Sequence, residues 1–465
     1  MSGEEFRRHG HAVIDWIADY IDDVEQYPVE SQVAPGDIRA LMPTSPPEAP
    51  EAFEDILADV DRIVMPGITH WQSPNWFAFF PASSSAPAIL GDLVSSGLGV
   101  QGMMWSTSPA CTEVESVVMD WLVELLGLPE GWRTTDQGGG VLQMSASDST
   151  HTALVVARHL ANEAGHTDET LVAYTSGQAH SSIEKGARVS GYGHVRKIDV
   201  DDEFALIPAA LEATIAADRE VGLHPTFVNS SVGTTATTAV DPVKTVGEIA
   251  RREGLWHHVD AAFAGSAMIC PEFRHHQDGL ELVDSYVFNP HKWLLTNFDC
   301  SAFFVADRKS LLETLSILPA YLRNEATESG AVIDYRDWHV PLGRRFRALK
   351  LWFVLRSYGA EGLRAHIRSH VEMAKGFEQK VIDDPRFELY SPTFFSLVCF
   401  RHVAGNDVTD TLAEAINATG KVSITRSEID GDSFIRVAVG STYTTQEHVD
   451  GLWELFDELA PVPAG

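Results

Sequence analysis

The chain has 465 residues, 44% hydrophobic and 22% charged, so it is long enough to bury a sizeable core. Lysine and arginine total 34 against 66 aspartates and glutamates, which gives a formal net charge of −32 at pH 7. Because nucleic acids and anionic membranes bind basic surfaces, this acid excess argues against both as partners, and it is typical of a soluble protein or a salt-tolerant cytoplasm.

The first segment predicts amphipathic helices and no export signal. It lacks the apolar core of a signal peptide, and no later stretch approaches the about 18 apolar residues that a membrane span needs. Apolar residues recur at helical spacing over 13–24 and over 53–63, with a proline cluster between them. Helices with one apolar face cannot form a core alone. We therefore expect residues 1–83 to be a helical arm that packs on the rest of the chain or on a second subunit.

The remainder divides into two expected domains. From 84 to 351 helices alternate with strands, which predicts an α/β domain with a mainly parallel sheet flanked by helices. The expected strands of this domain are 141–144, 171–175, 226–229, 255–259, 286–288 and 302–305. Residues 352–465 carry two further expected strands, and a capping box from Thr444 to Glu447 precedes a last helix. This part predicts a small α+β domain.

A lysine and an aspartate follow neighbouring strands of the large domain. The strand at 286–288 stops at Asn-Pro and is followed by Lys292, while Asp260 ends the preceding strand. Open α/β sheets bind ligands at the carboxyl ends of their strands. A poorly solvated lysine can form a Schiff base and a carboxylate can keep a pyridine nitrogen protonated, so the pair fits pyridoxal 5'-phosphate (PLP) chemistry. Two simpler interpretations stay open: a surface lysine extended past Trp293, and a helix cap or solvated loop acid at Asp260.

Polar residues also follow the other strands. His180 comes after 171–175 and could stack on a cofactor ring or be an ordinary core or surface histidine. Thr235 comes after 226–229. A glycine-rich loop leads through the first strand to Ser145-Ala146-Ser147, at a helix N-terminus that could bind phosphate. The alternatives are a flexible loop with an ordinary serine cap, or a nucleotide site, although neither the Walker pattern nor G-x-G-x-x-G is present.

The cysteines predict neither a disulfide framework nor a metal site. The chain has four of them, without a C-x-x-C pair or zinc-ligand spacing: Cys111, Cys270, Cys300 and Cys399. Reduced thiols of this kind are usual in the cytoplasm, where we expect the protein to reside, with no bound metal.

Seven segments carry a resemblance that runs from Phe6 to the last helix. They are FRRHGHAVIDWIADY, MPGITHWQSPNWFAFFP, SPACTEVES, GQAHSSIEKG, HVDAAFAGSA, NPHKW and DYRDWHVPLGRRFRALK. On these motifs the chain resembles the aromatic L-amino-acid decarboxylase family, the group II PLP-dependent decarboxylases of fold type I. The resemblance implies a carboxy-lyase that works as a homodimer, with active sites at the subunit interface and arms that clasp the partner subunit.

The resemblance also implies roles for individual residues around the cofactor. Lys292 forms the Schiff base with PLP, Asp260 pairs with the pyridinium nitrogen, Ala262 packs under the ring and His180 stacks on its other face. Thr235 lies close to the cofactor or to the substrate carboxylate. The residues implied at the phosphate are Ala146, Ser147, Asn289 and His291.

Catalysis and substrate binding follow from the same resemblance. Tyr321 matches a mobile-loop tyrosine that protonates the substrate carbon, directly or through His180, and the polar stretch 323–334 fits a mobile lid. The implied substrate wall is flat and apolar, which suits an aromatic amino acid and not glutamate. Its members, of which Gln101 and Met103 come from the partner subunit, are Trp71, Phe79, Phe80, Pro81, Ala82, Gln101, Met103 and Gly343.

Three positions of this wall indicate substrate preference. Gly343 goes with indole or broad aromatic substrates, because the histidine-specific and plant tyrosine-type relatives carry serine there. Phe79 replaces the usual tyrosine, and Ala82 replaces a threonine that contacts a catechol hydroxyl. With these hydroxyl partners absent, the wall has less reason to prefer a catechol. We expect tryptophan, 5-hydroxytryptophan or phenylalanine to be preferred over L-dopa.

Two other functions remain open. Close relatives oxidatively deaminate the amino acid to an aldehyde, and they carry phenylalanine at the position of Tyr321 or asparagine at that of His180. Both residues are kept here, which favours simple decarboxylation to the amine and CO2. A non-catalytic interaction protein on the same fold would be expected to lose Lys292 or Asp260, and both are present.

Overall fold

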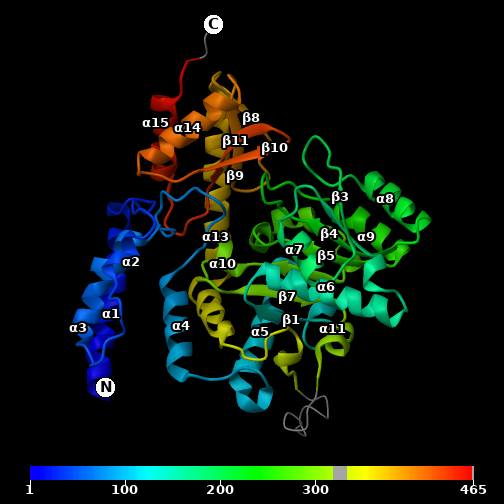
Figure 1. Cartoon of the computed structure of the whole chain (residues 1–465), viewed down its shortest axis with the longest axis horizontal. Coiled ribbons are helices and arrows are strands. Elements are labelled where there is room, and N and C mark those ends of the chain that lie inside the picture. The colour runs from blue at the N-terminus through cyan, green and yellow to red at the C-terminus, as the bar shows by residue number, and fades with distance from the viewer. Residues whose placement is uncertain (318–331, 463–465) are drawn as a thin grey trace. The chain divides into compact units, whose positions relative to one another are not determined.

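A computed structural model describes residues 1–317 and 332–462, which form two compact units (Figure 1). The large unit comprises Ala82–Lys375 and Leu389–Cys399. The small unit comprises Met1–Pro81, Gly376–Glu388 and Phe400–Gly465.

A seven-stranded sheet forms the centre of the large unit, in the order β1-β7-β6-β5-β4-β2-β3. Its strands are β1 Gly139–Gln143, β2 Leu171–Ser176, β3 His194–Ile198, β4 His224–Ser231, β5 Trp256–Asp260, β6 Ser285–Phe288 and β7 Ser301–Val305. The pairs from β6 through β5, β4 and β2 to β3 are parallel, while β7 runs antiparallel to both of its neighbours. The prediction of a mainly parallel sheet flanked by helices is therefore confirmed.

Helices connect the strands and cover the sheet. They are α4 Ala86–Leu98, α5 Pro109–Leu126, α6 Ala146–Glu163, α7 Ser182–Val189, α8 Pro208–Glu220, α9 Val243–Glu253, α10 Pro290–Trp293 and α11 Arg308–Leu315. The long helix α13, Arg347–Asp383, is interrupted at Gly359, where a φ of 62° joins two helical halves at a kink.

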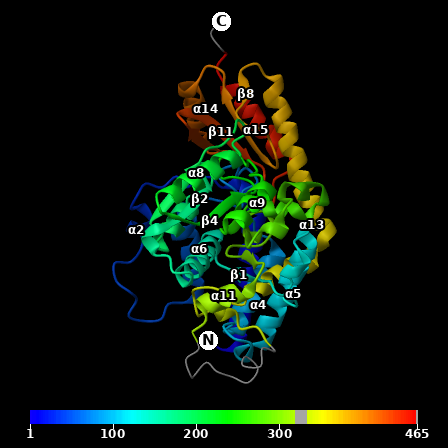
Figure 2. The same cartoon turned by 90° about the vertical axis from the view of Figure 1, so that its right-hand side faces the viewer.

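Both faces of the large sheet are covered, as alternate residues of β2 show. Val172 and Tyr174 lie in a hydrophobic cluster with residues of α8 and α9, whereas Leu171 and Ala173 lie in a second cluster with residues of α6 and α7. Successive side chains of a strand point to opposite faces, so the two helix pairs pack on opposite sides of the sheet (Figure 2). This burial leaves the strand ends and the loops that follow them for the site.

The small unit combines terminal helices with most of a second sheet, of order β10-β11-β9-β8. Its helices are α1 Gly3–Asp23, α2 Asp37–Leu41, α3 Phe53–Asp59, α14 Asn406–Ala418 and α15 Gln446–Leu459. The strands are β8 Phe387–Leu389, β9 Leu397–His402, β10 Thr425–Ile429 and β11 Asp432–Ala438. Asp430 and Gly431 both have positive φ between β10 and β11, which is the Asp-Gly two-residue hairpin turn.

The predicted capping box of the last helix was one residue too early. Thr445 caps α15, and His448 occupies the position that returns a side chain to the cap backbone. Thr444 is unavailable because its hydroxyl donates to the carbonyl of Pro74 at 2.6 Å.

Neither membrane-spanning helices nor metal clusters were found in the described ranges. No helix within 1–317 or 332–462 is both long and apolar enough to cross a membrane. In the same residues, no group of three or more histidine, cysteine, aspartate or glutamate side chains could hold a metal ion. The four cysteines are buried and unbridged.

Candidate active site

Two neighbouring strand ends bring the predicted aspartate and lysine to the same edge of the large sheet. Asp260 is the last residue of β5 and pairs in register with Val287 of β6, and Lys292 follows β6 on the short helix α10. The loops after these strands are tied together, because Ala261 N–H donates to the Val287 carbonyl at 2.9 Å and Asn289 N–H donates to the Ala262 carbonyl at 3.0 Å. The order of strands in the sheet thus sets the separation of the acid and the amine.

The carboxylate of Asp260 is held in one orientation. It is 7% exposed, and its Oδ1 accepts the backbone N–H of Ala262 at 2.9 Å. The carbonyl of the same residue accepts the N–H of Val232 at 2.9 Å, which fixes the end of β5 to the loop after β4. A buried, oriented carboxylate next to a small residue can face a flat cationic ring.

Backbone hydrogen bonds fix the turn that carries the half-buried Lys292. Its N–H donates to the Asn289 carbonyl at 2.9 Å, and its own carbonyl accepts both the N–H and the hydroxyl of Ser83, at 3.3 and 2.5 Å. Ser85 repeats this contact three residues on, where its hydroxyl donates to the Leu295 carbonyl at 2.6 Å. Sequence reasoning missed both serines, because no local pattern reports a contact across more than 200 residues.

His180, in the loop between β2 and α7, lies close to both charged residues. His180 is partly exposed to solvent, and the desolvation that remains lowers its pKa below the ordinary value of 6.5; the negative charge of Asp260 opposes this shift, and the positive charge of Lys292 adds to it. Its Nδ1 accepts the backbone N–H of Ser182 at 3.2 Å and contacts the hydroxyl of the same residue at 2.8 Å. The neutral ring therefore carries its proton on Nε2. Ser182 was also missed, although it stands only two residues beyond His180.

A helix N-terminus and an asparagine lie among the residues predicted for the phosphate. Ala146 and Ser147 begin the 18-residue helix α6, whose cap Ser145 accepts the Asp148 N–H at 3.2 Å. Asn289 is 3% exposed, and its Oδ1 has no hydrogen-bond partner in the described part of the chain. An unpaired buried amide oxygen usually indicates a partner that the protein itself does not supply.

His291 is used within its own turn. Its Nδ1 accepts the Cys300 N–H at 2.9 Å, and burial together with the charge of Lys292 lowers its pKa to about 3. This bond leaves Nε2 as the protonated nitrogen. Contact of His291 with a phosphate stays a prediction.

The structure describes Thr235, the remaining predicted cofactor residue, but not Tyr321, the predicted proton donor. Thr235 is exposed in the loop after β4, beside Gly233, which has a φ of 86° and would clash at 2.8 Å with Ala264 if it carried a Cβ atom. Tyr321 and most of the expected lid at 323–334 lie outside the described residues.

The predicted substrate wall falls into two groups. In the small unit, Trp71 stacks on Phe79 with ring centroids 5.7 Å apart, and Phe79 has a φ of 53° with its N–H donated to Thr425 at 2.7 Å. Phe80 lies under the guanidinium of Arg436, 5.3 Å from its ring centroid, and Pro81 is buried. A non-glycine residue at positive φ is strained and uncommon, and it often marks a functional position.

The second group belongs to the large unit. Gln101 Oε1 accepts the backbone N–H of Arg344 at 2.7 Å, and a Cβ atom at Gly343 would lie 3.4 Å from Gln101 Nε2. The Met103 carbonyl accepts the Arg336 N–H at 2.9 Å, and Ala82 is half-buried. The structure thus brings Gln101 and Gly343 together, while Trp71 and Phe79 form their own cluster in the other unit.

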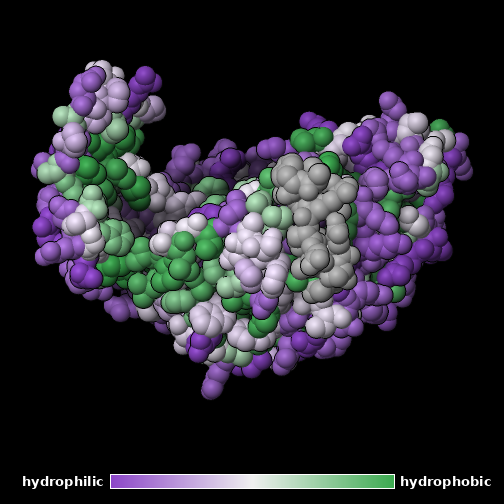
Figure 3. All heavy atoms as spheres, turned by 90° about the horizontal axis from the view of Figure 1, so that it is seen from below, coloured by the Kyte–Doolittle hydropathy of each residue, from purple (hydrophilic) through white to green (hydrophobic). Residues whose placement is uncertain are grey.

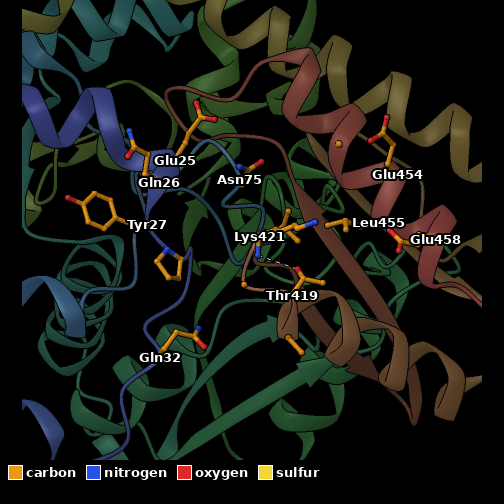
Figure 4. A pocket seen from close by; sticks show the side chains of 15 residues that line it. Glu25, Gln26, Tyr27, Gln32, Asn75, Thr419, Lys421, Glu454, Leu455 and Glu458 are labelled. Atoms are coloured by element: carbon orange, nitrogen blue, oxygen red, sulfur yellow. Dashed lines mark hydrogen bonds between the residues drawn. The ribbon is translucent and has the colours of Figure 1, made fainter.

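A pocket of about 720 Å³ in the small unit contains none of the predicted site residues (Figure 4). The carboxylates of Glu25, Glu454 and Glu458 line it together with the ammonium of Lys421. It offers no paired lysine and buried aspartate, so the chemistry predicted here belongs to the β5–β6 edge.

The β5–β6 edge provides what PLP requires. It combines a buried carboxylate, a lysine, a neutral imidazole close to both, and a helix N-terminus for a phosphate. The residues present therefore fit this cofactor.

Comparison with known proteins agrees with this fit. The family model described as "Pyridoxal-dependent decarboxylase conserved domain" matches residues 35–403. The chain is 45% identical over 473 residues to phenylacetaldehyde synthase of Arabidopsis thaliana, covering 99% of this chain and 96% of the relative. It is 45% identical over 474 residues to aromatic-L-amino-acid decarboxylase of Rattus norvegicus, covering 99% and 98%. The crystal structure of Oryza sativa TDC with PLP and tryptamine superposes with a TM-score of 0.97 at 41% identity, covering 99% of this chain and 98% of that one.

Proposed function

Because the chain belongs to the pyridoxal-dependent decarboxylase family, we propose that it converts aromatic L-amino acids into the corresponding aromatic amines and CO2, with PLP as cofactor. One observation carries the proposal: Asp260 ends β5, Lys292 follows the neighbouring parallel strand β6 on α10, and the charges of both act on His180. This is the arrangement that a lysine-bound pyridine cofactor needs.

The residues divide the work of the reaction. Lys292 would bind the aldehyde carbon of PLP, and the carboxylate of Asp260 would hold a proton on the pyridine nitrogen. His180 and Ala262 would cover the two faces of the ring, and the first residues of α6 would bind the phosphate. When bound, PLP supplies an electron sink for the electron pair left behind as CO2 departs.

Proton delivery falls to other parts of the chain. The hydroxyl of Tyr321 would give a proton to the substrate Cα, directly or through His180 Nε2–H. Thr235 would hold the substrate carboxylate or the cofactor.

The substrate class follows from the apolar wall. Trp71, Phe79, Phe80 and Pro81 would orient an aromatic side chain, and the lack of a side chain at Gly343 would favour an indole. Phe79 and Ala82 offer no hydroxyl to a catechol, so tryptophan, 5-hydroxytryptophan and phenylalanine should have a higher kcat/KM than L-dopa. A kcat/KM for L-dopa well above the other three would contradict this preference.

A homodimer is the assembly that we propose, because α4 presents an uncovered apolar face. Leu90, Leu93, Val94 and Leu98 lie at helical spacing on one side of this helix and are 44–57% exposed. Hydrophobic side chains gather in patches on the face seen in Figure 3. Gln101 and Met103 follow α4 directly, so a second copy seated on this face would receive them at its own site. An exposed apolar patch of this kind is typical of a subunit interface.

We also propose a cytoplasmic location, supported by four buried, unbridged cysteines and the acidic composition.

Product analysis tests the proposed reaction. The purified protein with PLP is incubated with each aromatic amino acid, and amine, CO2, aldehyde, ammonia and hydrogen peroxide are measured. We expect amine and CO2 in equal amounts without peroxide. Borohydride reduction followed by peptide mass spectrometry should place the cofactor on Lys292.

The second candidate function is an aromatic aldehyde synthase, which the likeness to the Arabidopsis phenylacetaldehyde synthase favours. Aldehyde, ammonia and peroxide in place of the amine would establish it. Absence of both PLP binding and product would instead support a non-catalytic interaction protein.

A further inference from the structure

The residue next to the reactive lysine is anchored from two sides. Trp293 is fully buried, and its indole stacks on Phe263 with ring centroids 4.6 Å apart and an interplanar angle of 12°. Phe263 directly follows Ala262, whose N–H holds the Asp260 carboxylate. The indole of Trp293 therefore links the turn that carries Lys292 to the loop that carries the acid.

The other anchor is a histidine far along the chain. Trp293 Nε1–H donates to His370 Nδ1 at 2.9 Å, and His370 is 2% exposed on the half of α13 that follows the kink at Gly359. An indole has one N–H and no other polar atom, and Trp293 is fully buried, so this hydrogen bond satisfies a donor that is shielded from bulk solvent. Loss of the acceptor would leave a buried donor unpaired beside the lysine.

His370 is suited to act only as an acceptor at Nδ1. Burial, with the neighbouring His366 as a second cause, keeps the pKa of His370 well below its ordinary value. The two imidazole centroids are 4.3 Å apart, and Nε2 of His366 has no hydrogen-bond partner in the described ranges. His366 thus offers the same ring on the same helix without a bond to Trp293.

We propose that His370 is a positioning residue for Lys292: by accepting the Trp293 indole hydrogen bond, it keeps α10 in the one orientation that points the lysine amine at the cofactor. The lysine carbonyl is already held by Ser83 on one side, and His370 holds the following residue on the other. The inference deepens the proposed function and rests on the role of Lys292 in binding PLP. His370 would act on the lysine only through Trp293, the residue to which it is bonded.

Three single variants separate positioning from packing. His370→Asn keeps an acceptor atom where Nδ1 stands, and His370→Leu fills the space without one. His366→Leu is the matched control, because it removes the neighbouring ring and leaves the hydrogen bond intact. Thermal unfolding of each PLP-loaded variant checks the fold. His370→Met, which also lacks a comparable acceptor, replaces His370→Leu if the latter does not fold.

The readouts are kcat at saturating PLP, the rate of PLP release, and the NMR signal of the Trp293 indole N–H. For His370→Leu we expect roughly a tenfold lower kcat and a severalfold faster PLP release, since a small displacement of a reacting group is costly. His370→Asn should stay within about threefold and His366→Leu within about twofold of the unmodified protein. The indole signal should shift strongly in His370→Leu alone.

A double variant tests whether the effect passes through the indole. Trp293→Phe lacks the N–H, so adding His370→Leu to it should change kcat and PLP release by less than about twofold. Equal loss in His370→Asn and His370→Leu, or a full effect of His370→Leu in the Trp293→Phe background, would overturn the proposal. If the unmodified protein binds PLP but decarboxylates nothing, the proposed function fails, whereas PLP release and the indole signal still decide the positioning role.

Discussion

At the scale of single residues, the acid of the site depends on one backbone contact. Asp260 Oδ1 accepts the Ala262 N–H, and this contact orients the carboxylate at the end of β5. An amide in the same place would keep that contact but lose the negative charge. Charge and orientation can therefore be separated by one substitution.

We expect Asp260→Asn to lower kcat by a factor on the order of 10² or more while the protein still folds, because the pyridine nitrogen would no longer be held protonated. The measurement is steady-state kinetics on tryptophan with excess PLP, alongside circular dichroism melting. Asp278→Asn, at an exposed position, serves as the control. An unchanged kcat at full PLP occupancy would remove Asp260 from the catalytic set.

At the scale of elements, one buried ion pair joins α5, β1 and the segment before α13. Arg344 and Glu115 are both fully buried, with Nη2 and Oε1 at 2.5 Å. Glu115 also accepts the Leu142 N–H at 2.8 Å, and Arg344 donates to the Leu142 carbonyl at 3.0 Å. Since Gln101 is bonded to the backbone of Arg344, this pair also supports the predicted substrate wall.

Removing the acid should leave an uncompensated charge in the core. We expect Glu115→Ala to reduce the free energy of unfolding by about 3–5 kcal/mol. Glu130→Ala breaks a pair with Arg133 in which the acid is exposed, so it should cost far less than Glu115→Ala. Urea unfolding of the three proteins measures both values. Similar reductions in the free energy of unfolding for the two variants would show that the buried pair contributes no more to stability than the Glu130–Arg133 pair.

The apolar face of α4 makes a separate prediction at this scale. Leu93→Glu should shift the protein from dimer to monomer, since a charge would be buried at the interface that we propose. Val189→Glu, on α7, is the control, because it changes an exposed apolar residue outside that face. Light scattering after size-exclusion chromatography gives the masses. A dimer that survives Leu93→Glu at low micromolar concentration would place the interface elsewhere.

At the scale of the whole molecule, buried histidines link stability to pH. Burial lowers the pKa to about 3 for each of His257, His258, His291 and His339. Below pH 6.5, the ordinary histidine pKa, these side chains become protonated in the unfolded chain but stay neutral in the folded chain. The folded state therefore loses stability as the pH falls. Asp241 and Asp284 act in the opposite direction, because burial raises their pKa to about 7 and about 6.

The four histidines outnumber the two acids, so the free energy of unfolding should fall between pH 6.5 and 4. The expected slope is about 1.4 kcal/mol per pH unit for each net proton taken up. Urea titrations at several pH values test this. A stability that rises on acidification would mean that the two aspartates dominate.

The sequence was most informative where local patterns end abruptly. Asp260 and Lys292 were found because apolar runs stop at a carboxylate and at Asn-Pro. The strand β3 was missed because it lies at the edge of the sheet and carries His194, Arg196 and Lys197. The contacts of Lys292 with Ser83 and of Trp293 with His370 were missed because they join distant segments. The predicted domain bounds and site roles stay predictions.

The reversed direction of β7 places the two ends of this strand at opposite edges of the large sheet, one beside the candidate active site and one away from it. Because β7 runs against its neighbours, the residues before it, including Cys300, lie on the lysine side, and the chain leaves β7 at the opposite edge. There Ala306 meets Asp284, at the start of β6. A tag or surface linkage attached at that edge would immobilise the enzyme with its active site facing away from the support. An attachment point chosen from the sequence alone would not guarantee this orientation.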